Sequence, residues 1–361
     1  MPHMTAYHSP TRVFCTIVPP HLLDRLARSA DPAVAAAARR TLVTDEANRT
    51  ARRLTTVTGV RPAPRGTPAA SGEPRRTVFD AEQRTRLPGR KVRAEGDGPT
   101  GDATVNRAYA GLGATFELFL RVYGRDSIDG AGLPLDATVH YDREYGNAFW
   151  NGEQMVFGDG DGEVFGDFTL PVDVIGHELA HGVTQYTANL AYFSQPGALN
   201  ESVSDVFGTL VKQYALGQTA EEADWLIGAG LLTDRVRGVA LRSMKAPGTA
   251  YDDDVLGKDP QPAKMEDYVE TAADNGGVHI NSGIPNHAFY LAATALGGHA
   301  WERAGQIWYD VLTGGKLKET ADFATFARLT VAAARERFGD DGAETEAVLK
   351  AWSTVGVPTR G

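Results

Sequence analysis

The chain has 361 residues, of which 42% are hydrophobic and 23% charged, a composition typical of soluble globular proteins with about two to three compact units. No stretch approaches the ~18 consecutive apolar residues that a membrane span needs, which excludes a membrane protein. The first residues lack the pattern of a Sec signal peptide, so both export by a non-classical route and a cytoplasmic location stay open. The single cysteine, Cys15, excludes an intrachain disulfide.

Charge is distributed unevenly along the chain. Residues 1–66 contain 10 basic and 4 acidic residues, a net charge of +6, whereas the remainder contains 26 basic and 42 acidic residues, a net charge of −16. A basic N-terminal piece tethered to an acidic body favours intramolecular docking and argues against nucleic-acid binding as the main role. An Arg-rich and Ala-rich background composition would give the same bias without any docking.

The N-terminal part is predicted to fold locally. Asp31 offers a capping side chain, Pro32 suits the first helical position, and strong helix formers follow. Residues 59–74 are rich in Gly, Pro and Ala and have no apolar period, which is typical of an exposed linker. We therefore expect an N-terminal unit over residues 1–58 and a linker over residues 59–76.

The next part of the chain is predicted to be rich in strands. One long helical pattern covers residues 105–123, among short alternating or aromatic runs such as 137–141 and 154–158. Beyond residue 171 the apolar residues recur at helical spacing in successive segments: 172–187, 199–216, 222–234, 284–297, 300–313, 320–337 and 341–353. Strands first and helices later predict an α+β fold.

The order of strands first and helices later predicts two lobes. We expect a strand-rich lobe over residues 77–195 and a helical lobe over residues 196–361, with a ligand site in the cleft between them.

The segment His177-Glu178-Leu179-Ala180-His181 lies within one of the predicted helices. His177 and His181 are four residues apart, so one helical turn presents both imidazoles on the same face, where they can share a metal ion. Neutral imidazole is a good zinc ligand, and a catalytic zinc takes three protein ligands plus water. Glu178 can accept the proton of that water and deliver it to the departing amine.

A third ligand is expected from the next predicted helix. Glu201 and Asp205 are also four residues apart, and Glu201 is the candidate ligand. Asp205, and Asn200 beside the ligand, can accept hydrogen bonds from the second nitrogens of the two imidazoles and so fix their tautomers. Without the histidine pair, an acidic pair on a helix would be read as a solvated face.

A further cluster is Asp274 to His279, in which two adjacent glycines permit a tight turn. His279 is either an orienting or charge-stabilising group, or an exposed histidine on a capped loop.

These clusters, in this order and spacing, resemble the thermolysin family of metallopeptidases from about Thr77 to the end of the chain. The resemblance implies a thermolysin-like two-lobe fold with the active site in the cleft. It also implies that Asn147 and the carbonyl of Ala148, in an edge strand, hold the substrate backbone. Tyr192 and His279 would stabilise the oxyanion, with His279 oriented by Asp274, and Arg242 would grip the substrate carbonyl beyond the scissile bond.

By the same resemblance an apolar pocket receives the residue that follows the scissile bond. An all-apolar wall rewards buried area at about 25 cal/mol per Å² and rejects charge, so a bulky apolar residue is the expected preference. Ordinary core packing is the alternative reading of these residues. The wall would be lined by Phe165, Phe168, Val174, Ile227, Leu231 and Leu241.

The sequence departs from thermolysin at its double calcium site. Asp173 and Asp224 match ligand positions, but Lys212, Leu226 and Ala229 stand where the family has carboxylates. Calcium prefers about six to eight oxygen ligands, whereas a lysine ammonium can pair with the two remaining aspartates directly. This substitution argues against calcium dependence.

The N-terminal unit resembles the short prosegment of protealysin-like members, on the basis of Cys15 to Pro20 and the following His21 to Leu23. The chain would then be a zymogen inhibited by its own prosegment. The region around the linker contains arginines suited to cleavage by the enzyme itself or by another protease. Cys15 either occupies the open position of the zinc as a thiolate or packs as a small apolar residue.

Two other functions compete with a zinc endopeptidase acting on peptides and proteins. A zinc aminopeptidase also combines HExxH with a downstream Glu, but usually one residue closer and with an acidic motif for the substrate amine, which we do not find. A metal-binding protein without turnover would need zinc ligands only. The presence of Glu178, Tyr192 and His279 together argues against it.

Overall fold

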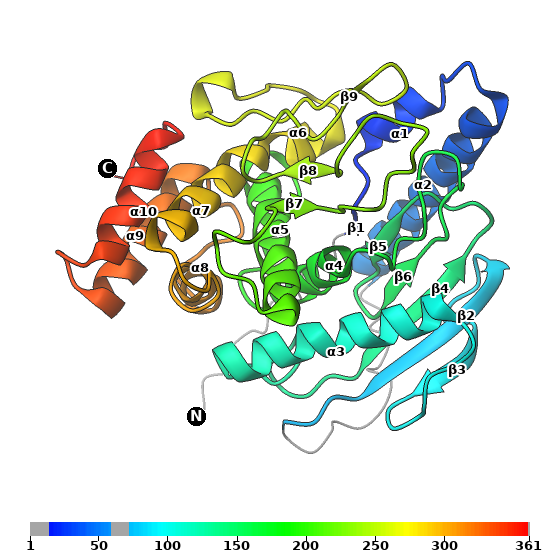
Figure 1. Cartoon of the computed structure of the whole chain (residues 1–361), viewed down its shortest axis with the longest axis horizontal. Helices are drawn as coiled ribbons and strands as arrows, with labels where there is room; N and C mark the ends of the chain where they lie inside the picture. The colour runs from blue at the N-terminus through cyan, green and yellow to red at the C-terminus, as the bar shows by residue number, and fades with distance from the viewer. Residues whose placement is uncertain (1–13, 59–71, 360–361) are drawn as a thin grey trace.

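The computed structural model describes residues 14–58 and 72–359. The sheet lies on one side of the molecule and helices α7 to α10 on the other, with α4 and α5 between them (Figure 1). None of the helices within the described ranges is long and apolar enough to cross a membrane. The linker expected at residues 59–76 and its arginines fall mostly outside the described residues.

A six-stranded mixed sheet forms the first lobe, in the order β1-β5-β6-β4-β2-β3. β5 pairs antiparallel with β6, which pairs parallel with β4, and β1 continues the sheet beyond β5. The strand predictions at 137–141 and 154–158 are confirmed. The strands are β1 Cys15–Thr16, β2 Arg76–Arg84, β3 Arg90–Ala94, β4 Leu135–Tyr141, β5 Ala148–Trp150 and β6 Met155–Phe157.

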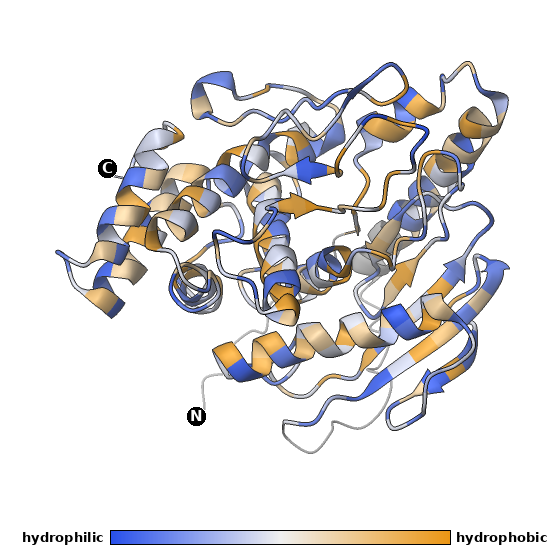
Figure 2. Cartoon of the chain, in the orientation of Figure 1, coloured by the Kyte–Doolittle hydropathy of each residue, from blue (hydrophilic) through white to orange (hydrophobic). Residues whose placement is uncertain are grey.

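The predicted helix at 105–123 is α3, Ala103–Tyr123. It begins at Asp102, whose side chain accepts the backbone N–H groups of the first turn, and it ends at Gly124 in the left-handed conformation. Figure 2 shows apolar and polar residues alternating around this helix, which packs one face on β2 and β4.

Helices α4, Val172–Gln185, and α5, Ser194–Leu216, pack against each other in the centre of the molecule. Both are buried along most of their length, polar residues included. Gly176 and Gly208 permit the close approach, because a Cβ at Gly208 would lie 2.6 Å from the carbonyl oxygen of Asp173.

Four further helix predictions are confirmed in the helical lobe. In its core, the rings of Trp308 and Trp352 are stacked, and both contact Phe326. The helices are α7 Gly283–Leu296, α8 Ala304–Thr313, α9 Phe323–Phe338 and α10 Ala343–Thr354. Short elements lie between α5 and α7 along the chain: β7 Leu226–Ile227, β8 Arg242–Ser243, β9 Asp252–Asp253, β10 Gly257–Lys258, the 3-10 turn Met265–Asp267 and α6 Asp274–Asn281.

The prediction of a helix at 222–234 is wrong. This segment contains β7 and a series of turns, in which Trp225, Gly228 and Gly230 have positive φ. The side chain of Asp224 accepts the backbone N–H of Leu226, which competes with a helical hydrogen bond. The apolar residues that recur here at helical spacing are instead buried side chains of a loop.

The N-terminal unit contains α1, Pro20–Leu26, and α2, Pro32–Thr58, the latter starting at the predicted proline. The predicted docking is observed, but apolar contact dominates it. Ile17, Leu22 and Leu23 are at most 1% exposed and belong to the main apolar core. Charge adds peripheral contacts, such as the hydrogen bonds from Arg25 to the carbonyl oxygens of residues 254 and 255.

Candidate metal centre and active site

The two histidines of α4 point their imidazoles at one location. The Nε2 atoms of His177 and His181 lie 3.0 Å apart, and the two side chains are buried. Glu201 of α5 places its carboxylate oxygens 3.5 Å from His177 Nε2 and 3.4 Å from His181 Nε2. The structure therefore brings together the three ligands predicted from the sequence.

The remaining atoms of this cluster fit a cation at its centre. The Nδ1 of His177 donates to Asp205 Oδ1 at 2.8 Å, and the Nδ1 of His181 lies 2.9 Å from Asn200 Oδ1. With Nδ1 protonated, each Nε2 keeps a lone pair directed at the other ligands. Within the described ranges, Glu201 Oε2 is buried without a hydrogen-bond partner. Three converging acceptors of this kind are a zinc-type donor set.

Burial lowers the pKa of His181 to about 4, although Glu201 opposes the shift. The imidazole is therefore neutral at physiological pH, as a metal ligand must be. Ser204 Oγ also lies 3.0 Å from His181 Nδ1. The sequence analysis missed this serine, whose position one turn after Asn200 was the available signal.

Glu178 is fully buried beside the three ligands. Its Oε2 accepts the backbone N–H of Trp150 at 2.9 Å, and its Oε1 has no hydrogen-bond partner among the residues that the structure describes. Burial and the neighbouring charge of Glu201 raise the pKa of Glu178 well above its usual range. A carboxylate with one fixed and one free oxygen, and with a raised pKa, is suited to accept and release a proton.

Tyr192 and His279 lie beside Glu201 at the same centre. The Tyr192 hydroxyl donates to Glu201 and lies 3.3 Å from His279 Nε2. His279 Nδ1 lies 2.6 Å from Asp274 Oδ1, and its backbone N–H donates to Oδ2 of the same carboxylate at 2.9 Å. His279 is 3% exposed, so the alternative of an exposed loop histidine is excluded.

The backbone before His279 explains this geometry. Asn275, Gly276 and Gly277 have positive φ, and the turn they form carries Asp274 back to the imidazole. Burial alone would lower the pKa of His279, but the charges of Asp274 and Glu201 outweigh it and raise the pKa to about 9.

Arg242 and His177 share one carboxylate. Arg242 donates to Asp205 through Nε at 2.9 Å and Nη2 at 2.8 Å, and Asn286 Nδ2 adds a third donor at 2.8 Å. Asp205 is fully buried, and four donors compensate its charge. Asn286 was not predicted, because its contact with Asp205 spans 81 positions of sequence.

Comparison with known proteins identifies the family. Residues 72–185 match the thermolysin metallopeptidase catalytic domain, and residues 188–357 match the alpha-helical domain of the same peptidases. The chain belongs to the thermolysin family. It is 52% identical to an extracellular metalloprotease of Pectobacterium carotovorum subsp. carotovorum, over 97% of this chain and 98% of that protein.

A solved structure and a more distant relative agree. The precursor of protealysin, a metalloproteinase from Serratia proteamaculans, superposes with a TM-score of 0.85 and 53% identity, over 95% of this chain and 99% of that one. A thermolysin of Alicyclobacillus acidocaldarius subsp. acidocaldarius is 40% identical over 78% of this chain, which spans 50% of that protein. The chain is thus a metalloprotease, and its predicted two-lobe fold is confirmed.

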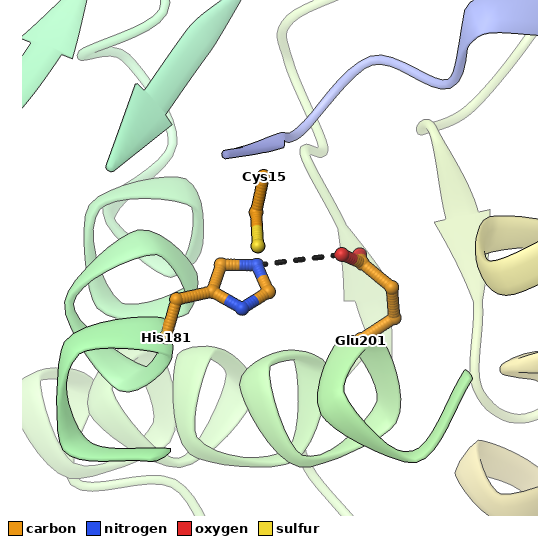
Figure 3. A group of neighbouring side chains, drawn as sticks. All are labelled: Cys15, His181 and Glu201. Atoms are coloured by element: carbon orange, nitrogen blue, oxygen red, sulfur yellow. Dashed lines mark ion pairs between the residues drawn. The ribbon is translucent and has the colours of Figure 1, made fainter. Parts of the chain in front are cut away.

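In this thermolysin-family chain the N-terminal unit lies on the predicted substrate-binding strand. β1 pairs antiparallel with β5, Cys15 opposite Trp150 and Thr16 opposite Phe149. Strand β1 was not predicted, because two residues carry no periodicity and their partner lies far along the sequence. The Sγ of Cys15 and one ligand atom each of His181 and Glu201 lie within 4.8 Å of one another (Figure 3).

Asn147, directly before β5, is held from both sides by the N-terminal unit. Asn147 Oδ1 accepts the backbone N–H of Val18 at 2.9 Å, and its Nδ2 donates to Asp45 of α2 at 3.0 Å. Tyr145 donates to the same aspartate. Burial raises the pKa of Asp45 to about 6 despite these hydrogen bonds. The sequence analysis missed Asp45, which looks there like an ordinary surface residue of a helix.

The residues predicted to line the specificity pocket are buried, none more than 3% exposed, and they share the main apolar core with Ile17. They are Phe165, Phe168, Val174, Ile227, Leu231 and Leu241.

At the position of the double calcium site, Lys212 forms the predicted ion pairs. Its Nζ lies 3.2 Å from Asp173 Oδ2 and 2.7 Å from Asp224 Oδ2. Asp173 is fully buried, and burial raises its pKa although Lys212 opposes the shift. The ammonium therefore occupies the space between the two carboxylates that remain.

Proposed function

We propose that this protein is a zinc-dependent endopeptidase, made as a latent precursor, that cleaves peptide bonds before bulky apolar residues. The observation that supports this most directly is the convergence of His177, His181 and Glu201, with Glu178 beside them. Membership of the thermolysin family agrees with it.

In the proposed mechanism, residues of both lobes take part in proton transfer and in stabilising the oxyanion. When bound to the triad, zinc acts as a Lewis acid that polarises the peptide carbonyl and lowers the pKa of water. Glu178 takes the proton from the attacking water through its free Oε1 and passes it to the departing nitrogen. His279 and Tyr192 donate to the carbonyl oxygen as negative charge develops on it.

Substrate binding is assigned to the edge strand and to Arg242. Asn147 and the carbonyl of Ala148 hold the peptide in antiparallel register, and Arg242, fixed by Asp205, donates to the next carbonyl. The apolar wall described above receives the side chain that follows the scissile bond. Because that wall offers no polar partner, charged side chains are rejected there.

The N-terminal unit is proposed to be an inhibitory prosegment. Its strand β1 covers β5, and its Cys15 lies at the metal centre, which supports the thiolate role over simple packing. The similarity to a protealysin precursor agrees with this assignment. A Cys15→Ser precursor as latent as the wild-type precursor would refute the role of the sulfur. We further infer action outside the cell, as the name of the Pectobacterium carotovorum relative states for that protein.

The test is Glu178→Gln in the processed protein, assayed on an N-terminally blocked peptide with an internal Leu. Activity should fall by about 10²- to 10⁴-fold while zinc content stays unchanged, since Glu178 is not a ligand. Glu302→Gln, at an exposed position, is the matched control. Equal activity of wild type and Glu178→Gln would refute the mechanism, and no cleavage of the blocked peptide by the wild type would favour an aminopeptidase.

A further inference from the structure

The prosegment strand satisfies every substrate-binding group of the proposed site with its own backbone. The N–H of Ile17 donates to Ala148 O at 3.1 Å, and the N–H of Val18 donates to Asn147 Oδ1 at 2.9 Å. Arg242 Nη1 donates to the carbonyl of Ile17 at 3.0 Å. These contacts fix both the direction and the register of the strand.

The same register points one carbonyl at the metal centre. His279 Nε2 lies 2.9 Å from the carbonyl oxygen of Thr16 and 3.5 Å from Glu201 Oε2. His279 has an acceptor at each ring nitrogen, Asp274 at Nδ1 and Thr16 at Nε2, so both nitrogens donate. Of the described prosegment carbonyls, that of Thr16 is the one that contacts His279, one of the two groups proposed to stabilise an oxyanion.

The side chain after this carbonyl suits the proposed specificity. Ile17 is fully buried and belongs to the same apolar core as the predicted pocket wall. A bulky apolar residue directly follows the Thr16–Ile17 bond, as the proposed preference requires.

The sulfur of Cys15 distinguishes this arrangement from an enzyme–substrate complex that could react. It lies within 4.8 Å of a ligand atom of His181 and of Glu201, where a metal-bound water would otherwise lie in the proposed mechanism (Figure 3). The cavity next to it, lined by Trp150 and Asn200 among others, has a volume of only about 10 Å³. That space holds at most one water molecule.

The geometry points to Thr16–Ile17 as a second cleavage site, held in substrate register and protected by Cys15. The inference rests on the proposed function. Once the sulfur is removed, a water oxygen adds to the carbonyl carbon of Thr16, the bond from that carbon to the nitrogen of Ile17 breaks, and the departing nitrogen takes a proton. The products are a Thr16 carboxylate and a new N-terminus at Ile17.

The experiment compares full-length zinc-loaded precursors by intact mass spectrometry. Cys15→Ala should lose residues 1–16, whereas the wild type and the double variant Cys15→Ala/Glu178→Gln should not. Val34→Ala, which removes buried contact from α2 and leaves Cys15 in place, is the matched control and should not be cut at this bond. Cleavage of Val34→Ala at the same bond and to the same extent would overturn the proposal, because loosening alone would then suffice.

Hydrogen–deuterium exchange gives a readout that does not depend on turnover. In the Glu178→Gln background, the amides of Ile17 and Val18 should be equally protected with Cys15 or with Ala at that position. Loss of protection would overturn the proposal, since Cys15 would then hold the strand rather than protect the bond.

The proposed function is judged separately, by the activity of the processed wild type on the blocked peptide. An active enzyme together with an intact, protected Cys15→Ala precursor would refute only the second cleavage site.

Discussion

The helix pair α4 and α5 carries two buried polar clusters that differ in one respect. At one end the carboxylate of Glu201 faces the imidazoles of His177, His181 and His279. One turn before His177, Asp173 is equally buried but is paired with Lys212 of α5. Both clusters lie between the same two helices, and both contain a fully buried carboxylate.

The different partners of these two buried carboxylates bear on where a metal ion can bind. A buried carboxylate needs a cation or several donors, because desolvation of the charge is costly. At Asp173 the chain supplies its own ammonium, which pairs with Asp173 and Asp224. At Glu201 the nearby cations are shared with other acceptors: His279 Nε2 lies 3.5 Å from Oε2 but also contacts the carbonyl of Thr16, and Arg242 is committed to Asp205. A metal ion bound there is expected to supply further positive charge.

The largest predicted effect is at the metal end. Glu201→Gln replaces an anionic ligand by a neutral amide, so zinc content should fall and activity should drop more than the ~10- to 100-fold that loss of an outer-shell partner costs. Zinc analysis and peptide cleavage measure both. A variant that kept its zinc and its activity would contradict the assignment of Glu201 as a ligand.

At the other end, Lys212→Met should lower the free energy of unfolding by about 3–5 kcal/mol, because Asp173 would be left buried and unpaired. Urea unfolding measures the change, and the double variant Asp173→Asn/Lys212→Met should recover part of it. Calcium chelation with zinc kept saturating should leave the wild-type melting temperature unchanged. A sharp fall on chelation would show that Lys212 has not replaced the ion.

The smallest effect concerns a titratable cation on the first lobe. Hydrogen bonds with Asp159 and Asp102 raise the pKa of His140 to about 9, despite partial burial. The resulting stabilisation is present below the unfolded pKa of about 6.5 and is lost as pH rises through about 9. His140→Asn should therefore cost on the order of 1 kcal/mol at pH 6, after allowance for solvent screening, and little at pH 10.

Thermal unfolding at the two pH values checks this prediction. A deficit of His140→Asn that stayed constant from pH 6 to pH 10 would contradict the role of charge at His140.

The sequence predicted the parts of the site that depend on local spacing. His177 with His181, and Glu201 with Asp205, are four residues apart on helices, so their shared faces follow from helical geometry. It also predicted the pairing of Lys212 from the residues that stand at the calcium position. It failed at 222–234, where Gly228 and Gly230 adopt positive φ and an apolar pattern belongs to a loop.

Only the tertiary structure decided which distant residues complete the site. Thr16 contacts His279 across 263 positions, Asp45 contacts Asn147 across 102, and Asn286 contacts Asp205 across 81. No periodicity encodes such contacts, because they arise when separate elements pack into one core. The sequence by itself determined a metal-binding helix pair and a docked N-terminal unit, and the packing of that unit set Cys15 and the Thr16 carbonyl against the metal centre.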